Sequence, residues 1–159
     1  MERVTVRTAT LDDLDTLLGF EKGIMTTERP FDPTIQEGDV HYYDIAHMIT
    51  AANVEVAVAE SGGEIIGSGY VRIEDSKAFL KHKKHGFLGF MYVKPEDRGK
   101  GVNQKVIEAL QQWAISRGVN EFRLEVYDRN SPAIKAYEKL GFTKLLIEMR
   151  MEVPAGKSK

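Results

Sequence analysis

The chain has 159 residues, of which 42% are hydrophobic and 29% charged, and it contains no cysteine. This composition is that of one soluble globular domain, and the lack of cysteine excludes disulfides, thiolate catalysis and iron–sulfur clusters. Because 22 basic residues face 24 acidic ones, for a net charge of −2, we expect neither nucleic acid nor a membrane surface as partner. No apolar run could span a bilayer and the first residues lack a secretory core, so we expect a cytoplasmic protein.

The first half of the chain predicts strands and helices in alternation. Thr10, followed by Asp13 three residues later, predicts the cap of the first helix. The polar run at 81–85 is expected to be a solvated connection between strands. Alternating or continuous apolar runs predict strands at 3–8, 54–58, 64–74 and 86–94, and a further helix is expected near 42–52.

The second half predicts a strand–helix–strand unit at 86–127, whose two strands should be parallel neighbours. A second helix is expected to start with Ser131 as its cap and Pro132 at its first position. A last strand is expected at 145–151. Together the elements predict an α/β sheet covered by helices on both faces, forming one domain over 1–153 with a disordered tail at 154–159.

The turn Arg98-Gly99-Lys100-Gly101 lies between a buried strand and an amphipathic helix. Backbone N–H groups at a helix start lack partners, and glycines let the main chain approach a phosphate, so pyrophosphate binding is one interpretation. The other is a tight turn that happens to be basic. The spacing matches neither a Walker loop nor a dinucleotide fingerprint.

Two sequence blocks, MYVKPEDRGKGVNQKVIEAL at 91–110 and YDRNSPAIKAYEKLGF at 127–142, resemble the GNAT superfamily of N-acetyltransferases. The family's Arg/Gln-x-x-Gly-x-Gly/Ala loop corresponds to Arg98-x-x-Gly101-x-Asn103, where Asn103 departs from the usual small residue. The second block fits the family's Asn-x-x-Ala-x-x-x-Tyr…Leu-Gly-Phe pattern, starting at Asn130. The two blocks cover about a quarter of the chain.

The resemblance implies a mixed, mostly antiparallel central sheet with a splayed pair of parallel strands, and acetyl-CoA as co-substrate. The pantetheine arm would pair with the main chain at Met91 and Val93, and amides near Tyr92 and Val93 would polarise the thioester carbonyl. Asn130 would hydrogen-bond to the pantetheine arm. The implied acetyl-CoA-binding residues are Met91, Tyr92, Val93, Arg98, Gly99, Lys100, Gly101, Val102, Asn103, Gln104, Asn130, Ala133 and Tyr137.

Attack of an amine on a thioester needs a base for the amine proton and an acid for the leaving thiolate. Tyr137 would lie beside the sulfur and, with a reference pKa of about 10, is neutral at pH 7 and can donate. Three candidates remain open for the base. They are Glu125, on the strand next to the opening between the splayed strands, Glu28, in the region where similar proteins build their acceptor sites, and a chain of water molecules.

The acceptor is expected to bind near residues 25–50, which carry five acidic residues and one basic residue. Such a segment would attract a cationic amine, with Phe31, Tyr42 and Tyr43 available for cation–π contacts. The alternative is a solvated loop whose aromatic residues fill the core, and Arg29 leaves open an acceptor that bears a carboxylate.

The leading interpretation is an N-acetyltransferase that transfers acetyl from acetyl-CoA to a primary amine of a cationic small molecule. The alternatives are a non-catalytic acyl-CoA sensor, or a transferase for another acyl group or for a protein amine. Gly89 hints at room near the thioester. A homodimer is compatible with this interpretation, and no histidine spacing indicates a metal site.

Overall fold

The computed structural model describes residues 2–156. Its contacts divide the chain into two units, Met1–Glu125 and Val126–Lys159, which are described separately below. Within the described chain, no helix combines the length and apolarity needed to cross a bilayer. The elements are β1 (Val4–Thr8), α1 (Leu14–Glu28), α2 (Ile45–Thr50), β2 (Val54–Ser61), β3 (Glu64–Asp75), β4 (Lys84–Val93), α3 (Val102–Ile115), β5 (Phe122–Leu124) and α4 (Ser131–Lys139), with 3₁₀ turns at Leu11–Asp13 and Pro95–Asp97.

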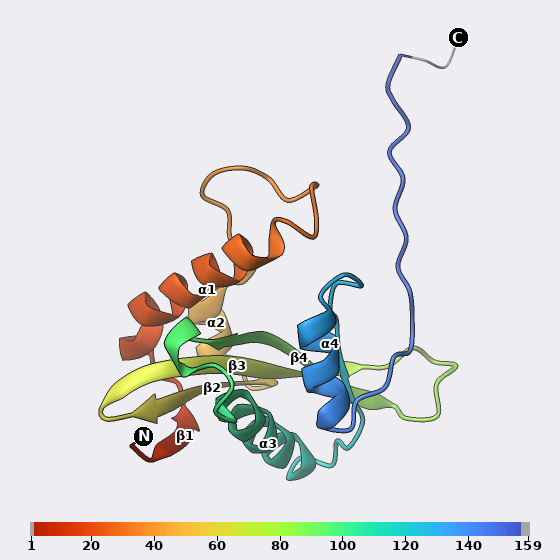
Figure 1. The fold of residues 1–159 in the computed structure, drawn as a ribbon. Coiled ribbons are helices and arrows are strands. Elements are labelled where there is room, and N and C mark those ends of the chain that lie inside the picture. The colour runs from red at the N-terminus through yellow and green to blue at the C-terminus, as the bar shows by residue number, and fades with distance from the viewer. Residues whose placement is uncertain (1, 157–159) are drawn as a thin grey trace. The chain divides into compact units, whose positions relative to one another are not determined.

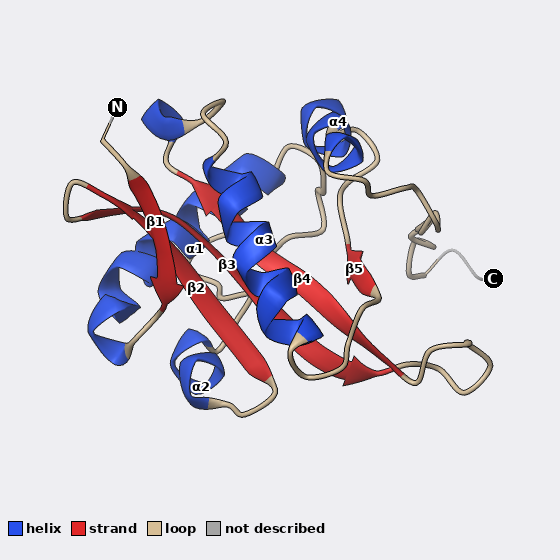
Figure 2. Cartoon of the chain, turned by 90° about the horizontal axis from the view of Figure 1, so that it is seen from below, coloured by secondary structure: helices blue, strands red, loops and turns tan. Residues whose placement is uncertain are grey.

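The first unit is built on a five-stranded sheet in the order β1-β2-β3-β4-β5. The pairs from β1 to β4 are antiparallel, and β4 pairs with β5 in parallel. Helices α1 and α2 cover one face of this sheet and α3 covers the other (Figures 1 and 2). The expected mixed sheet with helices on both faces is therefore confirmed.

Each face of the sheet carries its own layer of apolar side chains. On one face, Leu17 and Phe20 of α1 pack with Val56, Tyr70 and Phe90 of the strands. On the other face, α3 presents its buried stripe, which consists of Val102, Val106, Ile107, Leu110 and Ala114. Full burial of one such aliphatic side chain contributes about 1.5–3 kcal/mol, so the two layers hold the sheet between the helices.

The first helix begins as the sequence predicts, but through a 3₁₀ turn. Thr10 and Asp13 form a capping box, in which the Asp13 carboxylate accepts from the Thr10 N–H at 2.8 Å. The same carboxylate forms a bidentate salt bridge with Arg7, whose two terminal nitrogens donate to its oxygens at 2.8 and 2.9 Å. One buried carboxylate thus ties the end of β1 to the start of α1.

In the second unit, the start of α4 and the segment 145–151 both differ from the sequence expectations. Its N-cap is Asn130 rather than Ser131, because the Asn130 side chain accepts from the Ala133 N–H at 3.4 Å. The expected strand at 145–151 does not form in this structure, where the segment is neither helix nor strand. Of the expected tail, 154–156 form neither helix nor strand, and 157–159 lie outside the described residues.

Candidate active site

The parallel strands β4 and β5 separate after a short stretch of pairing. Gly86, Phe87 and Leu88 pair with Phe122, Arg123 and Leu124. β4 then continues to Val93, whereas β5 ends at Leu124. β5 is therefore shorter than the strand expected at 121–127. Within this unit, the pairing of β4 with β5 ends at Leu88. The expected splay of the parallel pair is present.

A bulge in β4 lies just beyond the point of separation. Phe90 has φ +56°, and it is the one described residue other than glycine with a positive φ. The pairing passes from Tyr70–Gly89 to Ser68–Tyr92, so Phe90 and Met91 together face a single residue of β3. Such an insertion bends the strand and re-aims the groups that follow it.

The bulge reverses the direction in which the N–H groups of β4 point. The Gly86 N–H donates to Glu121 O, on the β5 side, at 2.8 Å, whereas the Lys94 N–H donates to Ile66 O, on the β3 side, at 2.9 Å. These residues are an even number apart, and in a regular strand their N–H groups would point the same way.

After the bulge, therefore, the N–H groups of Met91 and Val93 point away from β3, toward the side that β5 has left. By the same alternation, the Tyr92 N–H points toward β3 and belongs to the ladder. Of the two amides expected to polarise a thioester carbonyl, the geometry favours Val93 over Tyr92.

The loop after β4 presents main chain rather than side chains. Gly99 and Gly101 have φ +76° and +80°, and a Cβ at either position would meet no atom within 4 Å. Gly101 is the N-cap of α3 and offers no side-chain cap, so the first N–H groups of this 14-residue helix lack intrahelical partners. Asn103, in the same turn, has a buried side-chain oxygen with no hydrogen-bond partner in the described part of the chain. These groups suit a pyrophosphate.

The two basic side chains of this loop are engaged with neighbouring groups. Arg98 Nε donates to Val93 O at 2.9 Å, and its guanidinium lies 5.7 Å from the centre of the Tyr92 ring. The Lys100 ammonium lies 3.8 Å from Asp97. Arg98 therefore ties the loop to β4. This contact is additional to the acetyl-CoA binding that the resemblance implies for Arg98.

Aromatic side chains gather on the α1 face of the sheet at the bulge. The Tyr43 ring lies 5.4 Å from Phe90 and 5.6 Å from Tyr70, centre to centre. A Cβ at Gly89 would lie 2.6 Å from the Tyr70 ring, so this ring fills the space over Gly89. The expectation that Gly89 provides room near the thioester is therefore wrong.

The charges of two carboxylates, Glu28 and Glu125, act on this aromatic cluster, which comprises Tyr43, Tyr70 and Phe90. Burial raises the pKa of Glu28, at the end of α1; a hydrogen bond with Tyr42 opposes the rise and nearby Asp32 adds to it. Burial also raises the pKa of Tyr70; Arg72 opposes the rise, and the charges of Glu74 and Glu125 add to it.

A polar chain that was not predicted from the sequence lies beside the cluster. Arg72 lies over the Tyr70 ring at 5.6 Å and donates to Glu74 at 2.7 Å. Glu74 in turn lies 3.1 Å from His85 Nε2, and the other ring nitrogen of His85 lies 2.8 Å from Ser76 Oγ. The run at 81–85 is therefore not wholly a solvated connection, because its last two residues belong to β4. Antiparallel pairing of Glu74 with His85 is the signal that could have revealed this chain.

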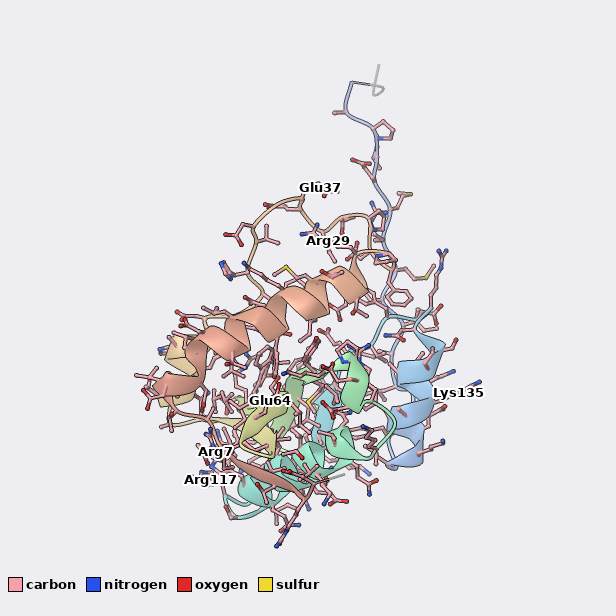
Figure 3. All side chains as sticks on the ribbon, turned by 60° about the vertical axis from the view of Figure 1, so that its left-hand side comes forward. Arg7, Arg29, Glu37, Glu64, Arg117 and Lys135 are labelled. Atoms are coloured by element: carbon pink, nitrogen blue, oxygen red, sulfur yellow. The ribbon has the colours of Figure 1, made fainter. Side chains whose placement is uncertain are left out.

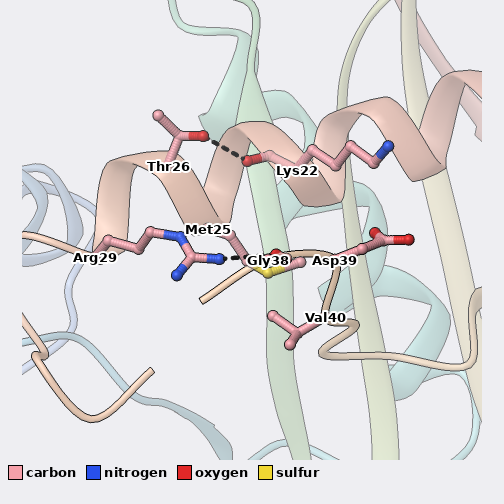
Figure 4. A pocket seen from close by; sticks show the side chains of 7 residues that line it. All are labelled: Lys22, Met25, Thr26, Arg29, Gly38, Asp39 and Val40. Carbon is pink, nitrogen blue, oxygen red and sulfur yellow. Dashed lines mark hydrogen bonds between the residues drawn. The ribbon is translucent and has the colours of Figure 1, made fainter. Parts of the chain in front are cut away.

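The acidic loop that follows α1 is folded around Arg29. This guanidinium donates to Gln36 O at 2.6 Å and to Gly38 O at 3.2 Å, and it lies 3.8 Å from Glu37 (Figure 3). A cavity of about 350 Å³ lies between the loop and the outer side of α1 (Figure 4); its lining is Lys22, Met25, Thr26, Arg29, Gly38, Asp39 and Val40. Arg29 is thus committed to its own loop, which argues against a role in binding an acceptor carboxylate.

In the second unit, the motif residues form one compact helix end. Asn130 caps α4, and the Phe142 N–H donates to Tyr137 O at 3.1 Å. The rings of Tyr137 and Phe142 meet edge to face at 5.9 Å. Gly141, with φ +101°, lets the chain turn back so that this contact forms.

A mixed sheet with a diverging parallel pair, a bulge and a glycine-lined helix start defines an acyltransferase-like class of fold. The profile of the Acetyltransferase (GNAT) family matches residues 22–142, and the chain belongs to this family. Aminoglycoside N(6')-acetyltransferase type 1 from Klebsiella aerogenes is 31% identical over 119 residues, covering 72% of this chain and 76% of that protein. Thialysine N-epsilon-acetyltransferase from Sus scrofa is 42% identical over 55 residues, but these span 35% of this chain and only 32% of that protein.

Solved structures show the same fold. A mutant protein from Bacillus halodurans superposes with a TM-score of 0.83 at 16% identity, over 94% of this chain and 99% of that one. A predicted acetyltransferase from Clostridium acetobutylicum, crystallised with acetyl-CoA, superposes with a TM-score of 0.68 at 20% identity, over 94% of this chain and 96% of that one. At such identities the likeness concerns the fold alone.

Proposed function

We propose that this protein is an N-acetyltransferase that transfers the acetyl group of acetyl-CoA to a primary amine of a cationic small molecule. The observation that carries the proposal is the unpaired side of β4 after the bulge. There the Met91 and Val93 N–H groups point away from β3, and the glycine loop 98–104, which is bonded to Val93 through Arg98, opens α3. Main-chain donors of this kind suit the amide-bearing pantetheine arm and the pyrophosphate of coenzyme A.

In the proposed reaction, the amine nitrogen attacks the thioester carbonyl carbon, the C–N bond forms and the C–S bond breaks. The amine loses a proton to a base, and the departing thiolate gains one from an acid. The Val93 N–H stabilises the developing oxyanion. Tyr137 supplies the proton to sulfur, a role supported by its place in the Asn130-x-x-Ala133-x-x-x-Tyr137 motif. Most of the rate enhancement comes from holding the two substrates together.

Glu28 is the base we favour, because burial raises its pKa toward the range in which a carboxylate accepts a proton effectively at neutral pH. Glu125 then contributes negative charge near the Tyr70 ring. With Arg29 and Arg72 both paired within the protein, these carboxylates and the aromatic cluster favour a cationic acceptor. Two relatives are named for amines of this kind, thialysine and aminoglycosides.

The test is to incubate the purified chain with acetyl-CoA and a panel of polyamines, aminoglycosides, amino acids and peptides. Free thiol and the acetylated product would be measured together. We expect thiol release that requires a cationic amine and equals the amount of product. Tight acetyl-CoA binding with no amine-dependent release would instead identify a sensor and refute the proposal.

The choice of base is tested by the pH dependence of kcat/KM. Activity should fall as pH drops through the Glu28 pKa, because the protonated carboxyl cannot accept the amine proton. In Glu28→Gln this acidic limb should disappear together with most of kcat. In Glu125→Gln, the matched control, the limb should remain and the acceptor KM should rise. The reverse pattern would assign the base to Glu125.

A further inference from the structure

A fully buried carboxylate on α1 holds the end of the acidic loop. Glu21 is 0% exposed. Its Oε1 lies 2.7 Å from His41 Nδ1, and its Oε2 accepts from the backbone N–H groups of Tyr42 and Tyr43, both at 2.9 Å. Three donors from consecutive residues thus converge on one side chain, which lies about twenty positions earlier in the chain.

These bonds lie where the proposed acceptor site needs precision. Tyr43 packs against Phe90 and Tyr70, and Tyr42 interacts with Glu28. The loop that delivers both tyrosines has no regular helix or strand between Glu28 and Ile45. Burying a carboxylate costs free energy that an apolar side chain would avoid, so its placement here needs a reason beyond packing.

We propose that Glu21 is a positioning residue for the acceptor: through His41 and the amides of Tyr42 and Tyr43 it sets the aromatic wall of the acceptor site. This inference rests on the proposed function. The wall is then held most firmly when His41 is protonated, because an imidazolium donates a charged hydrogen bond to Glu21. Acceptor affinity should therefore depend on pH, whereas acetyl-CoA affinity should not.

The charges around His41 define the direction of this dependence. Glu21 at 2.7 Å and Asp39 at 4.0 Å favour the imidazolium, and Lys22 opposes it. The hydrogen bond to Glu21 is the main cause that raises the pKa of His41 above its ordinary value. A raised pKa means that the stabilisation of the loop is fully present below about pH 6.5 and is lost as pH rises through the raised value.

The experiment measures the KM for acceptor and for acetyl-CoA, with kcat, in Glu21→Gln and His41→Gln. In Glu21→Gln we expect the acceptor KM to rise about ten-fold, the scale of a lost charged hydrogen bond, with acetyl-CoA KM unchanged. In His41→Gln the acceptor KM should no longer rise as pH increases through the raised His41 pKa. Asp39→Asn is the matched control, because the Asp39 side chain is 76% exposed and lies 4.0 Å from the outer ring nitrogen of His41, and it should keep the pH dependence. Equal changes in both KM values, or an acceptor KM that still rises with increasing pH in His41→Gln as it does in the wild type, would overturn the proposal.

Hydrogen exchange at the Tyr42 and Tyr43 amides separates this inference from the proposed function. In the wild-type chain both amides should be protected, with protection factors that decline above neutral pH. His41 is half exposed, so His41→Gln should fold even if Glu21→Gln does not, and it should remove that decline. Protected, pH-dependent amides in a chain that acetylates no amine would refute only the proposed function. Unprotected amides in the wild type would refute the positioning role.

Discussion

Arg98 reaches back to the strand that precedes it, and its Nε–H donates to the carbonyl oxygen of Val93 at 2.9 Å. The arginine that opens the glycine loop is thereby fixed to the residue whose own N–H points into the gap. This hydrogen bond ties the loop to the end of β4. The consequences can be tested at the glycines, the caps and the proposed acid.

Replacing Gly101 by alanine should weaken acetyl-CoA binding. At φ +80° an alanine is strained although no atom would touch its Cβ, so the loop must change conformation or bear the strain. We expect a loss of about 1 kcal/mol in stability and an acetyl-CoA KM raised by about ten-fold. Gly118→Ala is the control, with φ +82° and equally open surroundings at the far end of α3. It should lose the same stability and keep its KM; an equal rise in KM would show that strain alone is responsible.

Two glycines of α1 should respond to alanine with opposite signs. Gly19 has open space around it, so Gly19→Ala should stabilise the protein by about 0.5–1 kcal/mol through helix propensity. At Gly23 a Cβ would lie 2.7 Å from the Tyr92 ring, and that ring is held by Phe20 at 4.7 Å and by Arg98. Gly23→Ala should therefore destabilise by about 1–2 kcal/mol. Chemical denaturation measures both changes, and stabilisation by both would contradict the close packing of α1 on Tyr92.

Asp13→Asn should destabilise the protein by about 2 kcal/mol, because it removes the charged partner of Arg7 and weakens the capping box. The hydrogen bond from Arg7 is the main cause that lowers the pKa of Asp13. A lowered pKa gives stability that is present above the unfolded value of about 3.9 and is lost as pH falls below it. Unfolding curves at several pH values should thus converge for the two proteins in acid. A constant difference down to the lowest pH would exclude an ionic contribution.

Tyr137→Phe should lower kcat at least about ten-fold and leave the acetyl-CoA KM nearly unchanged. The phenylalanine retains the ring that meets Phe142 at 5.9 Å, so α4 should remain folded. Steady-state kinetics with the best amine of the panel, together with circular dichroism, provide the measurement. An unaltered kcat would remove Tyr137 from the mechanism.

The parts of the fold that depend on local sequence were predictable. Apolar alternation and apolar runs place β1 to β4 to within a few residues, and the Thr10–Asp13 spacing marks the start of the first helix. What depends on a distant partner was not predictable. The pairing of β5 with β4 ends at Leu124, and the apolar alternation of 145–151 cannot by itself supply a neighbouring strand.

The same distinction applies to the site. The glycine turn and the Asn130 motif are each formed by one continuous stretch of sequence, so the resemblance could be recognised from them. Glu21 looks from sequence like any polar position in an amphipathic helix, and only the folded loop brings His41 to it. Likewise, the Tyr70 ring fills the space expected at Gly89, and this contact between neighbouring strands could not be predicted from the spacing of residues in the sequence.

The extra residue in β4 makes the strand's length matter more than its composition. It sets the phase of the pleat, so that Tyr92 packs against Phe20 of α1 while Met91 turns to Gly69 and Val106 on the opposite face. Deleting one residue from 89–91 would invert that phase, exchange these two side chains and turn the Val93 N–H into the ladder. A substitution in this segment would remove individual side-chain contacts, whereas the deletion of one residue would remove the main-chain donors from the side of β4 that β5 leaves unpaired.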